Sequence, residues 1–211
     1  MVNIRFFRIN LWSITGYEPT LAAELAMSLE DNRLDIFQKI CDDTKISIGI
    51  GAPIKSENGI YISLVIFQPN QARQLYSKKF LHPDEEAFFI NGENDTVDLP
   101  NNIALAICYE LCIPEHSLNA FKNGAKIYIA SVAKSMSGYE KSSDILSSIA
   151  GKYSMIVLMA NAVGYCDNFE CAGRTSVWDN QGILKEQLDN AREGIIVIDT
   201  NTLIFEKFYI E

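Results

Sequence analysis

Short apolar runs rich in β-branched residues alternate with helical patterns along this chain, and this alternation limits its possible folds more than any other feature. Such runs, bounded by polar residues or glycine, are typical of buried strands. They lie at Ile46–Gly51, Ile60–Phe67, Ile103–Tyr109, Ala125–Ala130, Met155–Ala160 and Gly194–Asp199. Composition and helical spacing predict helices at Pro19–Leu29, Leu34–Cys41, Glu115–Lys122 and Tyr139–Lys152. This order predicts an α/β protein in which helices cover the faces of sheets.

Length and charge restrict the class further. The chain has 211 residues and no repeat or low-complexity linker, so we expect a single domain over 1–211, with an atypical basic and aromatic segment at 1–12. The formal charge of −9 argues against a nucleic-acid partner. The sequence contains no apolar segment long enough for a membrane span and no signal-peptide pattern. We therefore expect a cytoplasmic protein that binds neither nucleic acid nor membrane.

The five cysteines are an odd number, and three of them lie in or beside apolar runs. This pattern favours reduced thiols over a disulfide framework. The spacings Cys108/Cys112 and Cys166/Cys171 do not fit paired zinc ligands, and only two histidines are available. The sequence therefore predicts no metal site, and no organic cofactor is implied.

Cys108 is the first candidate for chemistry because it lies at the end of an apolar strand, where α/β folds commonly place their active sites. A cysteine in such a strand is more often a packing residue. Lys78 could likewise belong to a solvated loop, and Glu110 could be an exposed charge at a strand end. Taken separately, these residues do not establish an active site.

Four segments in order nevertheless resemble the nitrilase, or carbon–nitrogen hydrolase, superfamily. SITGYEPTLAAELA is similar to the segment that follows the family's first catalytic residue. YSKKFLHPDEEAFFING resembles the lysine segment, and IALAICYELCIPE resembles the nucleophile segment. NAVGYCDNFECAGRTSVWDNQG resembles the late asparagine–glycine and serine-strand segment. The resemblance runs from about Ser13 to the end of the chain.

This resemblance implies a nitrilase-like αββα sandwich, here without the family's opening strand and helix, and a homodimer or higher homo-oligomer that extends the sandwich. It also implies a Glu–Lys–Cys triad. Carried over by position, the nucleophile is Cys108 and the lysine is Lys78. A supporting glutamate of the lysine loop falls on Glu85, counted back from Gly92, with Glu86 as the alternative.

The residue types suit hydrolysis of a carbon–nitrogen bond. The Cys108 thiolate would attack an amide carbonyl or a nitrile carbon and form a covalent intermediate. Lys78 would favour the thiolate and stabilise the oxyanion together with the backbone N–H of Tyr109, while Glu85 would orient Lys78 or the attacking water. The residues expected to line the substrate pocket are Tyr109, Glu110, Glu86, Asn161 and Ser176, although strand ends and turns explain Asn161, Gly164 and Ser176 equally well.

One departure from the family concerns its general base, a glutamate that follows a proline. Asn10 and Leu11 occupy the corresponding positions, and a leucine side chain cannot accept a proton. We hypothesise a pattern broken near Leu11–Trp12 by a late start codon, a frameshift or a degraded gene. Glu18 and Glu24 are poor substitutes because they belong to the next predicted helix. General acid–base catalysis contributes roughly 10²–10⁴-fold, so we expect impaired activity.

The leading interpretation is an enzyme that hydrolyses a small linear amide, and less favourably a nitrile or a carbamoyl compound. The sequence does not separate an aliphatic amidase from an ω-amidase, a carbamoyl hydrolase or a nitrilase. The alternative is a catalytically inactive binding or assembly protein that retains Cys108 and Lys78 by descent. A metabolite-binding α/β module without covalent chemistry is a third, weaker interpretation.

Overall fold

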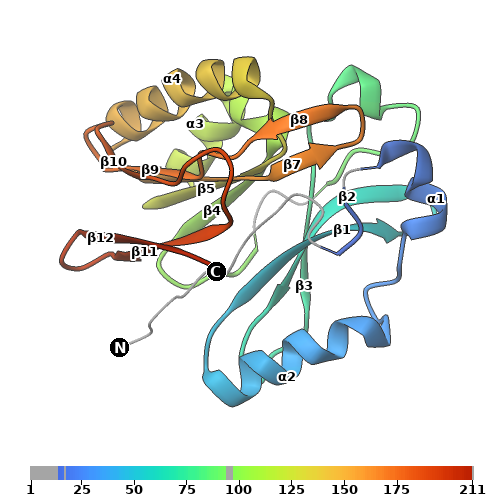
Figure 1. Cartoon of the computed structure of the whole chain (residues 1–211). Coiled ribbons are helices and arrows are strands. Elements are labelled where there is room, and N and C mark those ends of the chain that lie inside the picture. The colour runs from blue at the N-terminus through green and yellow to red at the C-terminus, as the bar shows by residue number, and fades with distance from the viewer. Residues whose placement is uncertain (1–13, 17, 94–96, 211) are drawn as a thin grey trace. The chain divides into compact units, whose positions relative to one another are not determined.

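The structure is a computed structural model that describes residues 14–16, 18–93 and 97–210. It divides into two compact units, residues 1–100 and residues 101–211, which are described separately below (Figure 1). Both units contain a sheet and helices, so the predicted α/β class is confirmed. None of the helices within the described ranges is long and apolar enough to cross a membrane.

The first unit is built on a three-stranded antiparallel sheet with strand order β1-β2-β3. Helix α2 packs on it through a core that contains Leu34, Cys41, Val65 and Phe67. The predicted helix at Leu34–Cys41 is therefore present, and it continues to Thr44. The elements of this unit are η1 (Pro19–Leu21), α1 (Ala22–Leu25), η2 (Asn32–Leu34), α2 (Asp35–Thr44), β1 (Ile48–Lys55), β2 (Ile60–Phe67), β3 (Gln74–Ser77) and η3 (Pro83–Glu85).

The helix predicted over Pro19–Leu29 is wrong beyond Leu25. The helix ends at Ala26, whose φ of −66° and ψ of 137° are extended. Met27 then forms a parallel bridge with Ile54: its N–H donates to Pro53 O at 3.1 Å, and its carbonyl accepts from Lys55 N at 2.8 Å. These two bonds satisfy the backbone while the Met27 side chain is buried, so tertiary pairing overrides local helix propensity.

The second unit is built on a five-stranded sheet with strand order β10-β9-β6-β5-β4, in which β4, β5 and β6 are parallel. Figure 1 shows α3 and α4 together on one face of this sheet. Leu146 and Ile149 of α4 enter the same core as Tyr128 and Trp178 of the sheet. The elements of the sheet layer are β4 (Ile103–Ile107), η4 (Cys108–Cys112), α3 (Pro114–Lys122), β5 (Ile127–Val132), α4 (Met136–Tyr153), β6 (Ile156–Asn161), β9 (Ser176–Trp178) and β10 (Leu184–Gln187).

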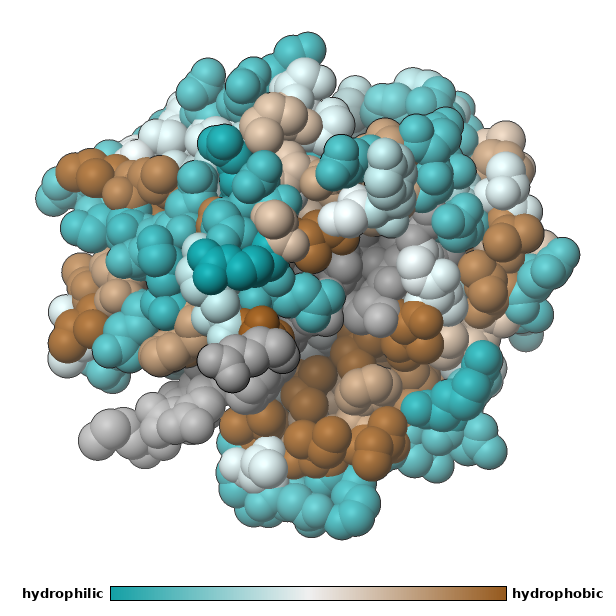
Figure 2. All heavy atoms as spheres, viewed as in Figure 1, coloured by the Kyte–Doolittle hydropathy of each residue, from teal (hydrophilic) through white to brown (hydrophobic). Residues whose placement is uncertain are grey.

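Two antiparallel hairpins complete the second unit: β7 (Val163–Cys166) with β8 (Phe169–Ala172), and β11 (Gly194–Asp199) with β12 (Ile204–Tyr209). The strand predicted at Gly194–Asp199 is present, but its prediction as a buried strand is wrong. In this hairpin Val197, Ile204 and Phe208 are exposed. Figure 2 shows hydrophobic surface where Figure 1 draws this hairpin. A two-stranded hairpin cannot cover its own faces, so side chains on a face without a packing partner stay exposed to solvent.

Several predicted boundaries shift for identifiable reasons. Helix α4 begins at Met136 and not at Tyr139, because the Ser135 side chain accepts the Gly138 N–H at 3.4 Å and caps the helix. Strand β4 ends at Ile107 and not at Tyr109, because the backbone turns at Cys108. The strand β5 lies two residues later than predicted.

Candidate active site

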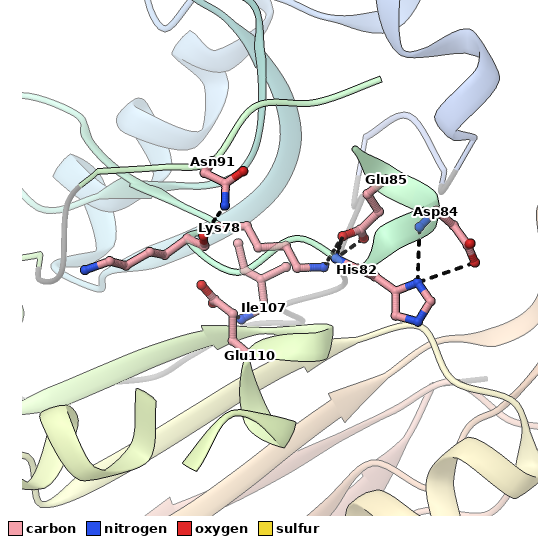
Figure 3. A network of polar contacts seen from close by, with 8 residues as sticks. Lys78, His82, Asp84, Glu85, Asn91, Ile107 and Glu110 are labelled. Atoms are coloured by element: carbon pink, nitrogen blue, oxygen red, sulfur yellow. Dashed lines mark hydrogen bonds and ion pairs between the residues drawn. The ribbon is translucent and has the colours of Figure 1, made fainter. Parts of the chain in front are cut away.

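Lys78 follows β3 directly and is fully buried in the first unit. Its backbone N–H continues the strand pairing by donating to Ile62 O at 2.8 Å. Its Nζ donates to both carboxylate oxygens of Glu85, at 2.8 and 2.6 Å, as Figure 3 shows. The alternative that Lys78 belongs to a solvated loop is therefore wrong.

Glu85 is held by more than this ion pair. It lies in the short helix η3, and its Oε2 also accepts the N–H of His82 at 2.7 Å. Glu85 is 2% exposed, so the carboxylate is taken out of water but given charged and neutral donors in exchange. Glu86 is exposed, and the geometry therefore favours Glu85 as the lysine's partner. Removing one member of such a buried pair typically costs about 3–5 kcal/mol.

A close backbone approach fixes the loop that carries this pair. Gly92 donates its N–H to Lys78 O at 2.7 Å. A Cβ atom at this glycine would lie 2.3 Å from Ser77 O and 2.7 Å from the Ser77 Cβ. Only glycine allows this contact, which returns the loop to the end of β3.

Cys108 lies at the end of β4 in the second unit, as predicted, and its backbone is unusual. Its φ is +46°, in the left-handed region that side chains other than glycine, asparagine and aspartate rarely adopt. The chain passes there from strand β4 into the 3-10 helix η4. Such strain typically costs about 1–3 kcal/mol and is concentrated at functional sites, where it holds a side chain in a required direction.

Glu110 lies two residues after Cys108 and is fully buried. Its Oε2 accepts the N–H of Ile107 at 2.8 Å, and so it bonds to the residue before the nucleophile candidate (Figure 3). The alternative of an exposed charge at a strand end is therefore wrong for Glu110. Tyr109, between them, is half-buried.

Glu110 also contacts His116, a residue that the sequence did not single out. His116 Nε2 lies 3.7 Å from Glu110 Oε2, and His116 Nδ1 lies 2.9 Å from the Tyr128 hydroxyl. The six-residue spacing between Glu110 and His116 matches no regular period, because it crosses from η4 into α3. No pattern in the sequence therefore indicates this contact.

Asn161 and Ser176 are both bonded to the scaffold of the second unit. Asn161 Oδ1 accepts the Lys134 N–H at 2.9 Å, and its Nδ2 donates to Lys134 O at 3.1 Å and Gly173 O at 2.8 Å. Ser176 Oγ donates to Arg174 O at 2.6 Å and accepts from Gln187 Nε2 at 3.0 Å. These bonds join the ends of β6 and β9 to neighbouring loops and to β10, and a contact with substrate stays a prediction.

The five cysteines differ in their environments, and all are free thiols. Burial raises the pKa of the Cys41 thiol to about 11. A side-chain hydrogen bond with Cys166, and then burial, raise the pKa of the Cys171 thiol. Cys108, Cys112 and Cys166 are half-buried. Within the described ranges, no group of three or more His, Cys, Asp or Glu side chains is placed to hold a metal ion.

The predicted site residues thus form two local arrangements. Lys78 and Glu85 meet in the first unit, whereas Cys108, Tyr109 and Glu110 form the turn after β4 in the second. The approach of Cys108 to Lys78 stays a prediction. Leu11 lies outside the described residues.

Comparison with known proteins gives a family match. The family described as "Carbon-nitrogen hydrolase" matches residues 12–203. A Staphylococcus aureus protein, "Hydrolase in agr operon", is 26% identical over 200 residues, which cover 90% of this chain and 76% of that protein. Solved structures with a similar fold are also found. Their sequence identity to this chain is low, so they are compared with it by fold alone.

Three solved structures have similar folds. A CN-hydrolase superfamily protein from Xanthomonas campestris, with an arsenic adduct in its active site, has a TM-score of 0.79 at 16% identity, covering 99% of this chain and 78% of that one. Nit3 from Saccharomyces cerevisiae, a nitrilase-superfamily member, has a TM-score of 0.74 at 17% identity, covering 84% and 69%. An amidase from Nesterenkonia sp. AN1 has a TM-score of 0.73 at 21% identity, covering 83% and 72%. The predicted nitrilase-like fold is confirmed.

The contact between Gly92 and Ser77 yields a prediction for stability. We expect Gly92→Ala to destabilise the protein by about 1–3 kcal/mol, because an added methyl group must displace backbone atoms of β3. Urea denaturation measures this change. Gly138→Ala is the matched control, since a Cβ at this helical position makes only ordinary contacts of 3.5 Å or more. Equal stability of the two variants would contradict the close approach at Gly92.

Proposed function

We propose that this chain, which belongs to the carbon–nitrogen hydrolase family, hydrolyses a small linear amide with Cys108 as the nucleophile. The observation that carries the proposal is the left-handed backbone of Cys108 at the carboxyl end of β4. A strained turn at the end of a strand presents a nucleophile away from the sheet, as the nucleophile elbow of other hydrolases does.

The reaction proceeds in two half-reactions. The Cys108 thiolate adds to the amide carbonyl, and the carbonyl oxygen becomes an oxyanion. The carbon–nitrogen bond then breaks, the nitrogen takes up from water the equivalent of the proton that the Cys108 thiol released and leaves as ammonia, and a thioester remains on Cys108. Water adds to the thioester, the carbon–sulfur bond breaks, and the carboxylic acid and the thiol are released. The sum is one amide and one water converted to one acid and one ammonia.

Lys78 provides the positive charge in this scheme. Its ammonium and the N–H of Tyr109 would bind the oxyanion, an interaction for which one donor is worth about 2.7–4 kcal/mol of the barrier. Glu85 supports this role because it fixes the Lys78 ammonium before any substrate binds. A donor that is already oriented has no reorganisation to undergo during the reaction.

Amides are favoured over nitriles as substrates. A cysteine-to-alanine mutant of the Nesterenkonia amidase has been observed with butyramide, and a glutamate-to-glutamine mutant with acrylamide added to its active-site cysteine. These compounds are short linear amides. We infer a substrate of the same class for this chain, with Asn161, Ser176, Tyr109, Glu110 and Glu86 as the predicted lining of its pocket. The homo-oligomer and the cytoplasmic location stay predictions from the resemblance.

The leucine at position 11 would make the chain slow without abolishing the reactivity of the thiol. In a variant of the Nesterenkonia amidase with a glutamate replaced by leucine, the acetamide moiety of fluoroacetamide is covalently bound to the active-site cysteine. Attack by the cysteine therefore does not require every carboxylate of such a site. We infer that Cys108 retains its nucleophilic character, whereas turnover suffers from the missing base.

Alkylation with iodoacetamide at neutral pH tests the nucleophile without requiring turnover. We expect Cys108 to react about tenfold or more faster than Cys112 and Cys166, a ratio that corresponds to about 1.4 kcal/mol. Peptide mapping over time measures all five rates in one sample. Cys112 and Cys166 are the internal controls because they are half-buried like Cys108.

The same measurement distinguishes the alternative function. If Cys108 reacts no faster than Cys112 and Cys166, the thiol is not activated. That outcome would contradict the proposed hydrolase and support an inactive binding or assembly protein.

The role of position 11 is tested by restoring a base. We expect Leu11→Glu to raise the hydrolysis of a short amide such as butyramide by at least about tenfold, because a positioned base contributes roughly 10²–10⁴-fold. Ammonia release measures turnover. Leu11→Gln is the matched control, since it has a similar shape but no proton-accepting carboxylate. Equal rates in the two variants would contradict the assignment of Leu11 to the base position.

A further inference from the structure

Three polar side chains form a chain of contacts behind the turn at Cys108. They are Glu110 of η4, His116 of α3 and Tyr128 of β5. Glu110 and Tyr128 are fully buried, and the His116 side chain is 12% exposed. The chain runs from the Tyr128 hydroxyl to His116 Nδ1 at 2.9 Å and from His116 Nε2 to Glu110 Oε2 at 3.7 Å.

When His116 is neutral, Tyr128 can donate a hydrogen bond to Nδ1 of the ring, and the N–H on Nε2 then faces Glu110. Burial, and then the charge of Glu110, raise the pKa of the Tyr128 hydroxyl well above its ordinary range, so Tyr128 keeps its proton. Its O–H can donate to His116 Nδ1, which leaves the proton of the imidazole on Nε2, the nitrogen that faces Glu110. Of the two tautomers that the Tyr128 contact allows, this is the one that turns an N–H towards the Glu110 carboxylate.

The last member of the chain, Glu110, bonds to the backbone of the residue before Cys108. Glu110 Oε2, the atom nearest His116, also accepts the N–H of Ile107 at 2.8 Å. Ile107 is the final residue of β4, and β4 is an edge strand of the five-stranded sheet. Cys108 follows immediately, with its φ of +46°. A strained backbone persists only where its surroundings determine it, and here the Glu110 carboxylate supplies one such constraint.

The surroundings make this carboxylate dependent on its partners. Tyr128 belongs to the same apolar core as its neighbours Ala106 and Leu111. A carboxylate beside such a core is costly unless donors face it. The His116 and Tyr128 rings pack edge to face, with their centroids 5.8 Å apart. This packing fixes the His116 ring, so His116 and Tyr128 are suited to hold the Glu110 oxygen in the direction of Ile107.

We propose that His116 and Tyr128 are positioning residues for Cys108, acting through the Glu110 carboxylate that bonds the Ile107 N–H. This inference rests on the proposed function, because it assumes that the Cys108 thiol is the nucleophile. It extends that function by assigning roles to two residues that belong to neither the predicted triad nor the predicted substrate pocket.

The test uses the full chain and four variants. Tyr128→Phe removes the hydroxyl and keeps the ring, and His116→Leu removes both ring nitrogens. His116→Gln keeps an N–H donor at a similar reach and is the conservative rescue. Tyr153→Phe is the matched control, because Tyr153 packs against the same core outside this chain of contacts. The readouts are the alkylation rate of Cys108 relative to Cys166 and the hydrogen exchange of the Ile107 amide relative to that of Val157 in β6.

We expect Tyr128→Phe and His116→Leu to slow Cys108 alkylation about three- to tenfold, the range for losing one neutral hydrogen bond. The hydrogen of the Ile107 amide should exchange faster in both variants, while the exchange rate of the Val157 amide stays the same. His116→Gln should recover most of the alkylation rate, and Tyr153→Phe should behave as the unmodified chain.

Two results would overturn the inference alone. One is alkylation at the unmodified rate in both Tyr128→Phe and His116→Leu. The other is faster exchange at Ile107 and Val157 together, which would indicate general loss of structure. If Cys108 of the unmodified chain is not alkylated faster than Cys166, the proposed function itself fails, and the inference fails with it.

Discussion

The fully buried ammonium of Lys78 is the constraint on which the first unit depends. A charge without exposure to water must be paired within the protein, and Glu85 supplies both carboxylate oxygens. That requirement explains the loop around it: η3 brings Glu85 to the lysine, and Gly92 allows the chain to return against β3. The pair contributes less to net stability than to orientation, because it holds one positive charge in a fixed direction.

In the second unit, the feature that the surroundings must stabilise is a strained backbone and not a buried cation. Its strand β4 ends at Ile107, and the next residue, Cys108, has a left-handed backbone conformation that a cysteine does not favour. The buried Glu110 carboxylate holds the preceding residue, and His116 with Tyr128 faces that carboxylate. Under the proposed function, each unit therefore holds one group in a fixed geometry, the Lys78 ammonium by its ion pair and Cys108 by the backbone of its turn. Preorganisation of this kind lowers the barrier of a reaction because it is established during folding.

Much of this organisation could be predicted from residue patterns. Strands such as Ile60–Phe67 were predictable because a short apolar run rich in β-branched and aromatic residues favours a buried strand over a helix. The pairing of Lys78 with Glu85 was predictable by resemblance, since family motifs preserve the distance between loop residues along the chain. The segment after Leu25 was not predictable, because its strand-like bridge depends on Pro53 and Lys55, which are distant in sequence.

The contacts of His116 and the backbone of Cys108 were also beyond sequence reasoning. Positive φ at a cysteine has no compositional signal, unlike a glycine in a turn. The burial of Glu110 could not be inferred either, because an acidic residue after a strand is usually exposed. In both cases tertiary contacts overrule the local preference, and such conflicts tend to occur at functional sites.

The central claim is that the sulfur of Cys108 and the ammonium of Lys78 act on the same substrate, and the rate of Cys108 alkylation in Lys78→Met tests it most directly. A cation beside a cysteine raises the fraction of reactive thiolate, so under the proposed function the loss of the Lys78 charge should lower the alkylation rate by at least about tenfold. Lys79→Met is the control because it removes the same charge from the adjacent residue. The double variant Lys78→Met with Glu85→Gln should show the same fall without leaving a buried carboxylate unpaired. An unchanged rate in Lys78→Met, or an equal fall in Lys79→Met, would contradict the account.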